Sequence, residues 1–123
     1  MTPRHVVAVV PDLFFATRIS ATAEAVGVVL EMPPMAAALE TIRKAPPALV
    51  VIDLHAPGDP LALVRALRAA PDTRHLRVIG FYSHVERELR AAALEAGVDE
   101  ALPRSAFTVR LPALLGGDGD RAG

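Results

Sequence analysis

The sequence predicts one α/β domain, in which five parallel strands form a doubly wound sheet covered by helices on both faces. Short apolar runs alternate along the chain with apolar residues at helical spacing, and this pair repeats five times. Parallel strands require such intervening helices as right-handed crossovers. The length of 123 residues suits a single domain.

The expected strands are short and apolar, as strands buried on both faces should be. The clearest is residues 6–10, which Pro11 and Asp12 end. Another, residues 49–52, leads directly into Asp53. In chain order, the five strands are expected at residues 6–10, 28–30, 49–52, 78–82 and 98–102.

The first three helices have recognisable ends. In the first, apolar residues recur at helical spacing and Gly27 stands where a C-terminal cap belongs. Pro33-Pro34 opens the second helix. Asp59 is expected to cap the third helix, whose first turn begins at Pro60.

The last two helices are expected to begin at serines. Ser83 and Glu86 form a capping-box pattern for the fourth helix, which Gly97 ends. Ser105 is expected to cap the fifth helix. Pro112 is expected to distort or shorten that helix, because proline lacks an N–H and clashes with the preceding turn.

Composition excludes several classes of protein. A net charge of -1 and 4% aromatic residues argue against a nucleic-acid binder. The absence of cysteine excludes disulfides and thiolate metal sites. No apolar run approaches the ~20 residues that span a bilayer, and the N-terminus lacks a signal-peptide pattern. We therefore expect a cytoplasmic protein with one domain over residues 1–115 and a flexible Gly/Asp-rich tail over 116–123.

A doubly wound sheet binds ligands at the carboxyl ends of its strands, where the strand order reverses. The polar residues expected at or just past those ends are Asp12, Asp53, His55, Tyr82, Ser83, His84 and Arg104. Asp53 has few structural uses at the end of a buried strand, so a functional role is favoured. Asp12 is an alternative helix cap, and Ser83 is favoured as a cap over a ligand.

The residues around Asp53 resemble a known family. Residues 51–58, Val-Ile-Asp-Leu-His-Ala-Pro-Gly, resemble the third-strand signature of response-regulator receiver domains. Residues 11–12 lie where receivers carry an acidic pair, and residues 78–84 and 97–105 resemble the fourth strand and the later lysine-proline stretch. The likeness spans residues 5–115 and implies the flavodoxin-like (βα)5 receiver fold.

The resemblance also implies a chemistry. Asp53 would be the phosphoacceptor that attacks a phosphoryl group from a histidine kinase. Mg²⁺ would be held, weakly, by Asp12, Asp53 and the backbone carbonyl of His55. The expected protein is not an enzyme beyond self-phosphotransfer onto Asp53.

Several positions depart from the family pattern. Pro11 replaces the first acid, Arg104 replaces the lysine, and Ala101 stands where an aromatic switch residue is expected. Arginine is longer and planar, so it would hold a carboxylate or phosphate in a different geometry, and a permanent Arg104–Asp53 pair is one possibility. Ser105 replaces the proline after the lysine.

The hydroxyl residue that follows the fourth strand is ambiguous. Tyr82 fills the position if one residue is deleted near Asp59, whereas ungapped counting assigns Ser83. Tyrosine is too bulky to move into the site as threonine does. Because Ala101 stands in place of the aromatic residue, the resemblance also implies that the usual coupling between the hydroxyl and an aromatic ring is absent.

These observations favour a stand-alone, atypical receiver-like signalling protein, a pseudo-receiver that acts by docking to a protein partner without standard aspartyl phosphorylation. The alternatives are a phosphorylatable receiver that uses Asp53 with Mg²⁺, a module that binds a small anion or nucleotide phosphate through Arg104, Ser83 and Ser105, and a structural homodimer. A transition-metal site of Asp12, Asp53, His55 and His84 has no motif support. The expected partner surface comprises Arg87, Glu88, Arg90, Ser105 and Phe107.

Overall fold

The predicted sheet is present in the computed structural model, which describes residues 3–83 and 86–117. All strand pairs are parallel, and the strand order is β2-β1-β3-β4-β5. The order reverses between β1 and β3, as the doubly wound prediction requires. The strands are β1 His5–Val9, β2 Val29–Glu31, β3 Leu49–Asp53, β4 Arg77–Tyr82 and β5 Glu100–Pro103.

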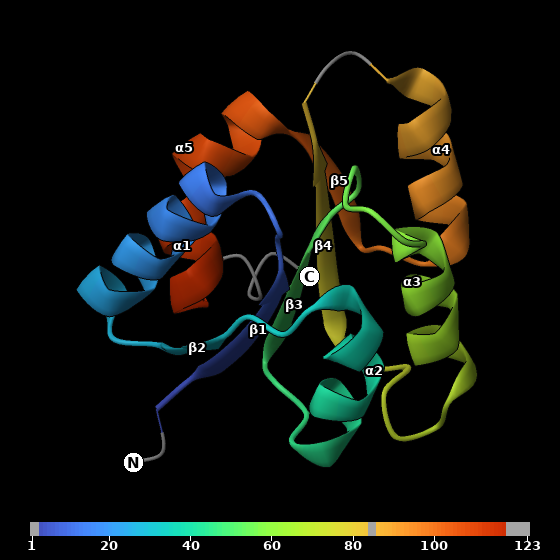
Figure 1. The fold of residues 1–123 in the computed structure, drawn as a ribbon, viewed down its shortest axis with the longest axis horizontal. Coiled ribbons are helices and arrows are strands. Elements are labelled where there is room, and N and C mark those ends of the chain that lie inside the picture. Colours follow the sequence, from blue (N-terminus) through green and yellow to red (C-terminus); the bar gives the residue numbers. More distant parts are fainter. Residues whose placement is uncertain (1–2, 84–85, 118–123) are drawn as a thin grey trace.

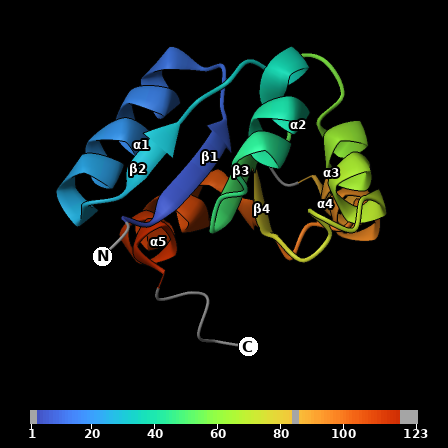
Figure 2. The ribbon, with the colours of Figure 1, turned by 90° about the horizontal axis from the view of Figure 1, so that it is seen from below.

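Five helices cover the two faces of this sheet. Two of them pack against one face and three against the other (Figure 1). The helices are α1 Leu13–Val26, α2 Met35–Lys44, α3 Pro60–Ala69, α4 Arg87–Ala96 and α5 Arg104–Gly116. Helices α1 and α5 form one layer, and α2, α3 and α4 form the other. Viewed from below, α1 lies beside the edge strand β2 (Figure 2).

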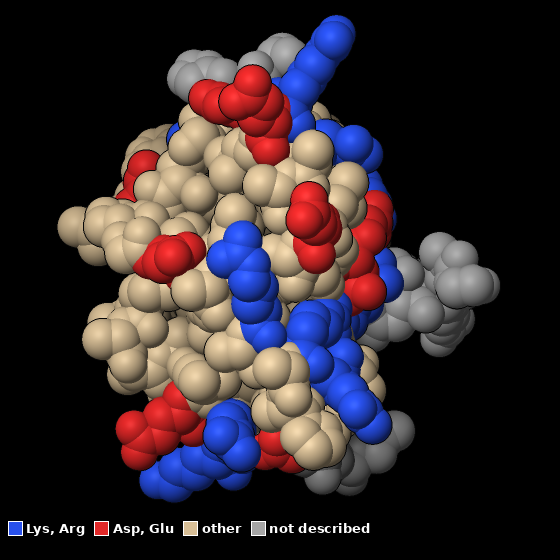
Figure 3. All heavy atoms as spheres, turned by 90° about the vertical axis from the view of Figure 1, so that its right-hand side faces the viewer, with Lys and Arg blue, Asp and Glu red and all other residues tan. Residues whose placement is uncertain are grey.

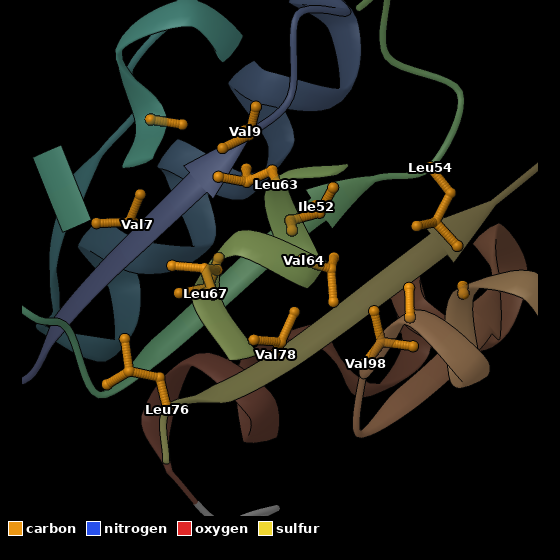
Figure 4. Close-up of a cluster of buried hydrophobic side chains, with 14 of the residues drawn as sticks. Val7, Val9, Ile52, Leu54, Leu63, Val64, Leu67, Leu76, Val78 and Val98 are labelled. Carbon is orange, nitrogen blue, oxygen red and sulfur yellow. The ribbon is translucent and has the colours of Figure 1, made fainter. Parts of the chain in front are cut away.

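Alternate residues of the strands supply the two cores. In β3, Val50 and Ile52 face α2, α3 and α4, whereas Leu49 and Val51 face α1 and α5. All five β3 residues are buried. The first cluster joins β1, β3 and β4 to the apolar side of α3 (Figure 4). Burial on both faces explains why the strands read as continuous apolar runs rather than alternating ones.

The caps expected at Asp12, Gly27 and Asp59 are present, and α2 begins directly after Pro34. The Asp12 side chain accepts a hydrogen bond from the Phe15 N–H, and the Asp59 side chain accepts one from the Ala62 N–H. Gly27 ends α1 at a φ of 77°, a left-handed conformation that favours glycine. Local sequence signals are therefore sufficient at these ends.

The predicted serine caps of the last two helices are wrong. Helix α4 begins at Arg87, four residues beyond Ser83, so the Ser83 hydroxyl does not cap it, and the N-cap residue Glu86 makes no side-chain cap bond. Helix α5 begins at Arg104, so Ser105 lies inside its first turn. The N-cap of α5 is Pro103, the last residue of β5, whose ring holds the backbone extended at that point.

Two further expectations are revised at the C-terminal end. Helix α5 continues past Pro112 to Gly116, so the proline does not shorten it. Gly116, which was expected in the tail, is the last residue of α5, and Gly117 caps the helix in a left-handed conformation. The rest of the predicted tail, 118–123, lies outside the described residues. No helix in the described part of the chain is long and apolar enough to cross a membrane.

Candidate functional site

Asp53 lies at the carboxyl end of the central strand β3, and its side chain is almost completely buried. Only 5% of the residue is exposed. One carboxylate oxygen, Oδ1, accepts a hydrogen bond of 2.9 Å from the His55 N–H. The backbone carbonyl of Asp53 also accepts a bond from the Ala56 N–H. The loop after β3 thus orients the carboxylate with one backbone donor, and a second backbone bond closes the turn at Asp53.

A close contact with β4 holds this loop in place. The Leu54 N–H donates to the Phe81 carbonyl at 3.0 Å. The Leu54 side chain lies over Gly80, where an added Cβ would come within 3.0 Å of several Leu54 atoms. Glycine at position 80 therefore permits the approach that fixes the backbone next to Asp53.

Asp12 follows the neighbouring strand β1, so it lies at the same edge of the sheet as Asp53. Val9 of β1 pairs with Ile52 of β3, which brings the two strand ends together. Asp12 is exposed, and its Oδ1 is occupied as the cap of α1. Pro11 contributes no side-chain oxygen. This edge of the sheet thus carries two carboxylates, Asp12 and Asp53, where the resemblance to receivers implies three.

These residues fit Mg²⁺ only with a smaller number of carboxylate ligands than the receiver pattern provides. Mg²⁺ is usually held by one or two carboxylates, with waters completing its coordination, so Asp12, Asp53 and the His55 carbonyl satisfy the minimum. Within residues 3–83 and 86–117, no group of three His, Cys, Asp or Glu residues is arranged to hold a metal ion. His84, from the proposed transition-metal set, lies outside the described residues. The other three members of that set do not form such a group.

Arg104 follows β5 and begins α5, but its guanidinium packs on aromatic rings. Its Cζ atom lies 4.8 Å from the centroid of the Phe15 ring and 5.9 Å from that of Phe81. Both distances are within the range of cation–π attraction. Arg104 makes no ion pair with Asp53, and its buried Nε has no hydrogen-bond partner in the described part of the chain. The permanent Arg104–Asp53 pair considered from the sequence is therefore not formed.

The rings beneath Arg104 belong to a cluster that the sequence analysis missed. Phe15 of α1, Phe81 of β4 and Phe107 of α5 meet with centroids 4.6 to 5.8 Å apart. Phe81 pairs with Asp53 across the sheet, so the cluster lies directly beside the carboxylate. The sequence could have indicated two of its members, because Phe15 and Phe107 are apolar residues in the first turns of two expected helices. That these helices are neighbours is decided by the fold.

Phe107 was expected on a partner surface, and this expectation is wrong. Its side chain is completely buried in the α1–α5 layer and stacks on Phe81 at 4.6 Å. The helical spacing that it shares with Leu111 and Leu114 places all three on the inner side of α5. It is therefore not available for docking.

The strand register shows how Tyr82 and Ser83 lie relative to Asp53. Phe81 pairs with Asp53, and Tyr82 is the next residue and the last of β4. Because side chains alternate along a strand, Phe81 shares the face of Asp53 and Tyr82 faces the opposite layer. Tyr82 is 7% exposed and belongs to the core beneath α2, α3 and α4. Ser83 is partly exposed just beyond the sheet.

The rest of the expected partner surface is accessible. Arg87, Glu88 and Arg90 of α4 and Ser105 of α5 are all exposed. On the side of the molecule that carries α3 and α4, basic and acidic side chains are interspersed (Figure 3). The exposed residues of the expected partner surface on α4 therefore include charges of both signs.

Between this surface and the α1–α5 layer, Glu100 of β5 bridges two arginines. It accepts from Arg110 at 2.8 Å and from Arg77 at 2.8 Å. The Arg110 hydrogen bond, with the charges of both arginines, lowers the pKa of Glu100 although burial opposes this. The bridge of Glu100 with these two arginines thus joins β4, β5 and α5.

We expect this bridge to give a pH-dependent contribution to stability. Because the folded-state pKa lies below the ordinary value of 4.5, the contribution is present above that value and is lost as pH falls through the folded pKa. Glu100→Gln should therefore lower the free energy of unfolding at neutral pH by up to about 1 kcal/mol, given its partial exposure. Urea denaturation across pH 3 to 7 measures this. An equal deficit at both ends of that range would contradict it.

A separate hollow of about 430 Å³ lies at the switch point of the sheet. It is formed by the ends of β1 and β3 and by the segment before α2, and its lining is apolar: Val9, Val10, Pro11, Met32, Pro33, Pro34, Met35, Ala56 and Pro57. Pro11 thus replaces a metal-binding acid with part of an apolar wall. The small-anion alternative gains nothing from this hollow, because no basic or hydroxyl side chain lines it.

The sequence matches no protein-family model and no curated protein. Its structure is similar to the chemotaxis response regulator CheY4 of Vibrio cholerae, with a TM-score of 0.81 and 19% identity over 93% of this chain and 97% of that chain. It is similar to a response regulator from Hahella chejuensis, with a TM-score of 0.82 and 18% identity over 93% of each chain. The Mn²⁺-bound form of response regulator Rcp1 gives 0.76 and 16% identity, covering 98% of this chain and 94% of that chain. The fold is that of response-regulator receiver domains.

Proposed function

We propose that this chain is a receiver-like signalling protein that acts by docking to a partner protein, without standard control by phosphorylation of Asp53. The proposal is supported by the receiver fold together with the altered residues around Asp53. Its docking surface comprises the exposed residues of α4 and α5, Arg87, Glu88, Arg90 and Ser105.

The position of Arg104 carries this proposal. In receivers, the residue at this position contacts the phosphorylated acceptor, and a compact lysine charge suits that task. Here the guanidinium rests on Phe15 and Phe81, and no ion pair joins it to Asp53. A response to phosphorylation would first have to remove Arg104 from these rings, which costs the cation–π attraction.

Two further features support the same conclusion. Pro11 leaves the metal with two carboxylates, and one oxygen of Asp12 already caps α1. Tyr82, which ends β4, is packed into the layer opposite Asp53, so a movement of its hydroxyl toward the acceptor requires repacking of the core.

The alternative function is that of a phosphorylatable receiver. The observation that favours it is Asp53 itself, a buried carboxylate at a strand end whose Oδ1 alone has a hydrogen-bond partner among the described residues. Asp12, Asp53 and the His55 carbonyl would hold Mg²⁺, which would neutralise charge on a transferred phosphoryl group. In this function the Asp53 carboxylate attacks phosphorus, and the bond from phosphorus to the kinase histidine breaks.

We expect backbone-amide NMR spectra to distinguish these functions. The protein is titrated with Mg²⁺ and then with beryllofluoride, a stand-in for the phosphoryl group. Under our proposal, no saturable shifts reach α4 or α5 at about millimolar Mg²⁺. Asp53→Asn is the matched control, since it keeps the shape of the side chain and removes its charge.

A saturable response near Asp53 that extends to α4 and α5, and is lost in Asp53→Asn, would establish the alternative. Arg104→Lys tests the reason for the difference. If beryllofluoride shifts the spectrum of the lysine variant but not that of the natural chain, the Arg104 guanidinium on its two rings prevents the response. If neither spectrum shifts, the cause is the smaller set of metal ligands or the packing of Tyr82.

A further inference from the structure

The first turn of α1 carries two adjacent large apolar residues that are exposed. Leu13 and Phe14 are 82% and 75% exposed. They are the only two neighbours in the sequence among the six large hydrophobic residues that are exposed in the described part of the chain. An exposed apolar pair of this kind indicates a contact surface.

A hollow follows these two residues along α1. It has a volume of about 410 Å³ and is lined by Ala16, Thr17, Ser20, Ala21, Glu24 and Met32. Small side chains form most of its floor, and the Thr17 hydroxyl already donates to the Leu13 carbonyl at 2.8 Å. Helix α1 stands at the outer edge of the fold, beside the edge strand β2 (Figures 1 and 2). Four of its lining residues, Thr17, Ser20, Ala21 and Glu24, are exposed on α1.

Two opposite charges accompany the hollow. Arg18 and Glu24 are both exposed on α1 and make no ion pair with any described residue. The Arg18 guanidinium lies 5.9 Å from the centroid of the Phe14 ring. Six residues separate the two charges, about 9 Å along the helix axis. They are too far apart to pair within one helix, but each is within reach of its opposite on an antiparallel copy.

We propose that a second copy of this chain docks here, with the two α1 helices antiparallel about a two-fold axis near the middle of the helix, between Arg18 and Ala21. A two-fold axis makes the surface its own complement. Phe14 of each copy then covers the Ala21–Glu24 end of the hollow in the other copy.

The same arrangement pairs the free charges. With the axis near the middle of α1, Arg18 of each copy reaches Glu24 of the other, which gives two equivalent ion pairs at the rim. This charge complementarity favours a second copy over a different protein as the occupant. Helix α1 has 14 residues and is about 21 Å long, so the contact buries less than the ~800 Å² per partner of a stable complex. We expect a reversible dimer with a Kd on the order of 100 μM.

Sedimentation equilibrium tests this proposal. Interference optics are needed because the chain has no tryptophan and one tyrosine. From about 10 μM to about 1 mM, the weight-average mass should rise from monomer toward dimer by mass action. Phe14→Ser should weaken association at least about tenfold, as expected for an aromatic anchor. Val109→Ser is the matched control, because Val109 on α5 is also 82% exposed, and association should be unchanged.

A charge exchange tests the antiparallel geometry. Arg18→Glu should weaken the dimer by placing two acids together in each pair, and Arg18→Glu combined with Glu24→Arg should restore it. A protein that stays monomeric at about 1 mM overturns the proposal. A dimer whose association is weakened by Val109→Ser and not by Phe14→Ser also overturns it. The same holds if the charge exchange does not restore the association that Arg18→Glu weakens. Saturation of α1 by a different protein that the Phe14→Ser variant cannot bind, with no self-association, would assign the surface to that partner instead. The proposal does not depend on phosphorylation of Asp53, so the two are tested separately.

Discussion

Phe107→Ala is expected to lower the free energy of unfolding by about 3–5 kcal/mol, the range for loss of a fully buried phenylalanine. The Phe107 ring is 0% exposed and lies 4.6 Å from Phe81 and 5.8 Å from Phe15. It joins α5 to β4 and α1. Its removal leaves a cavity that these three elements cannot close without moving, because each is also packed on the sheet.

Urea denaturation at micromolar concentration measures this effect, with Phe14→Ala as the control. Phe14 is 75% exposed, so the control should change the free energy of unfolding by less than about 0.5 kcal/mol. The low concentration keeps any self-association through α1 out of the comparison. Similar losses in the two variants would contradict the buried aromatic cluster. Such a result would also contradict the packing of Phe15 and Phe81, the two rings on which Arg104 rests.

Arg68→Ala is expected to cost about 2–4 kcal/mol, a large effect for a partly exposed residue. The Arg68 guanidinium donates to the carbonyls of Gly97, Arg74 and Leu76 at 2.6 to 2.8 Å, and to the Asp99 carboxylate at 3.0 Å. One side chain of α3 thus holds the segments that lead into β4 and β5. Truncation leaves these carbonyls without their charged donor.

Arg65→Ala is the control for this prediction. Arg65 lies on the same helix, is exposed, and makes no hydrogen bond or ion pair with the described residues, so its loss should cost less than about 0.5 kcal/mol. Arg68→Lys should recover only part of the loss, since an ammonium group cannot reproduce the planar fork. Equal stability of the Arg68→Ala and Arg65→Ala variants would show that the four bonds do not contribute in solution.

The altered site has a common physical theme. Pro11 adds to an apolar wall, Tyr82 ends β4 within the core, and Arg104 rests on two rings. If Tyr82 and not Ser83 fills the hydroxyl position, each of these residues is packed where the receiver pattern has a mobile or charged group. Packed side chains have discrete arrangements and resist small movements. Under our proposal, a partner protein therefore recognises the domain in one conformation.

The order of elements followed from the sequence alone. Periodicity distinguishes buried strands from amphipathic helices, and right-handed crossovers then leave few arrangements of the sheet. The caps at Asp12, Asp59 and Gly27 were also predictable, because each acts within its own turn. Asp53 was placed correctly at a strand end for the same reason, since the run before it is continuous and apolar.

Other features depended on contacts between distant segments. Ser83 and Ser105 have the residue type of a cap, but β5 extends to Pro103 and α4 starts at Arg87, so neither serine occupies a cap position. Tertiary packing also decided that Arg104 rests on Phe15 and Phe81 instead of pairing with Asp53. These rings are far apart in sequence and meet only when α1, β4 and α5 assemble. Local signals act through the backbone of a single turn, whereas the partners of a long side chain are chosen by whichever elements the fold brings beside it.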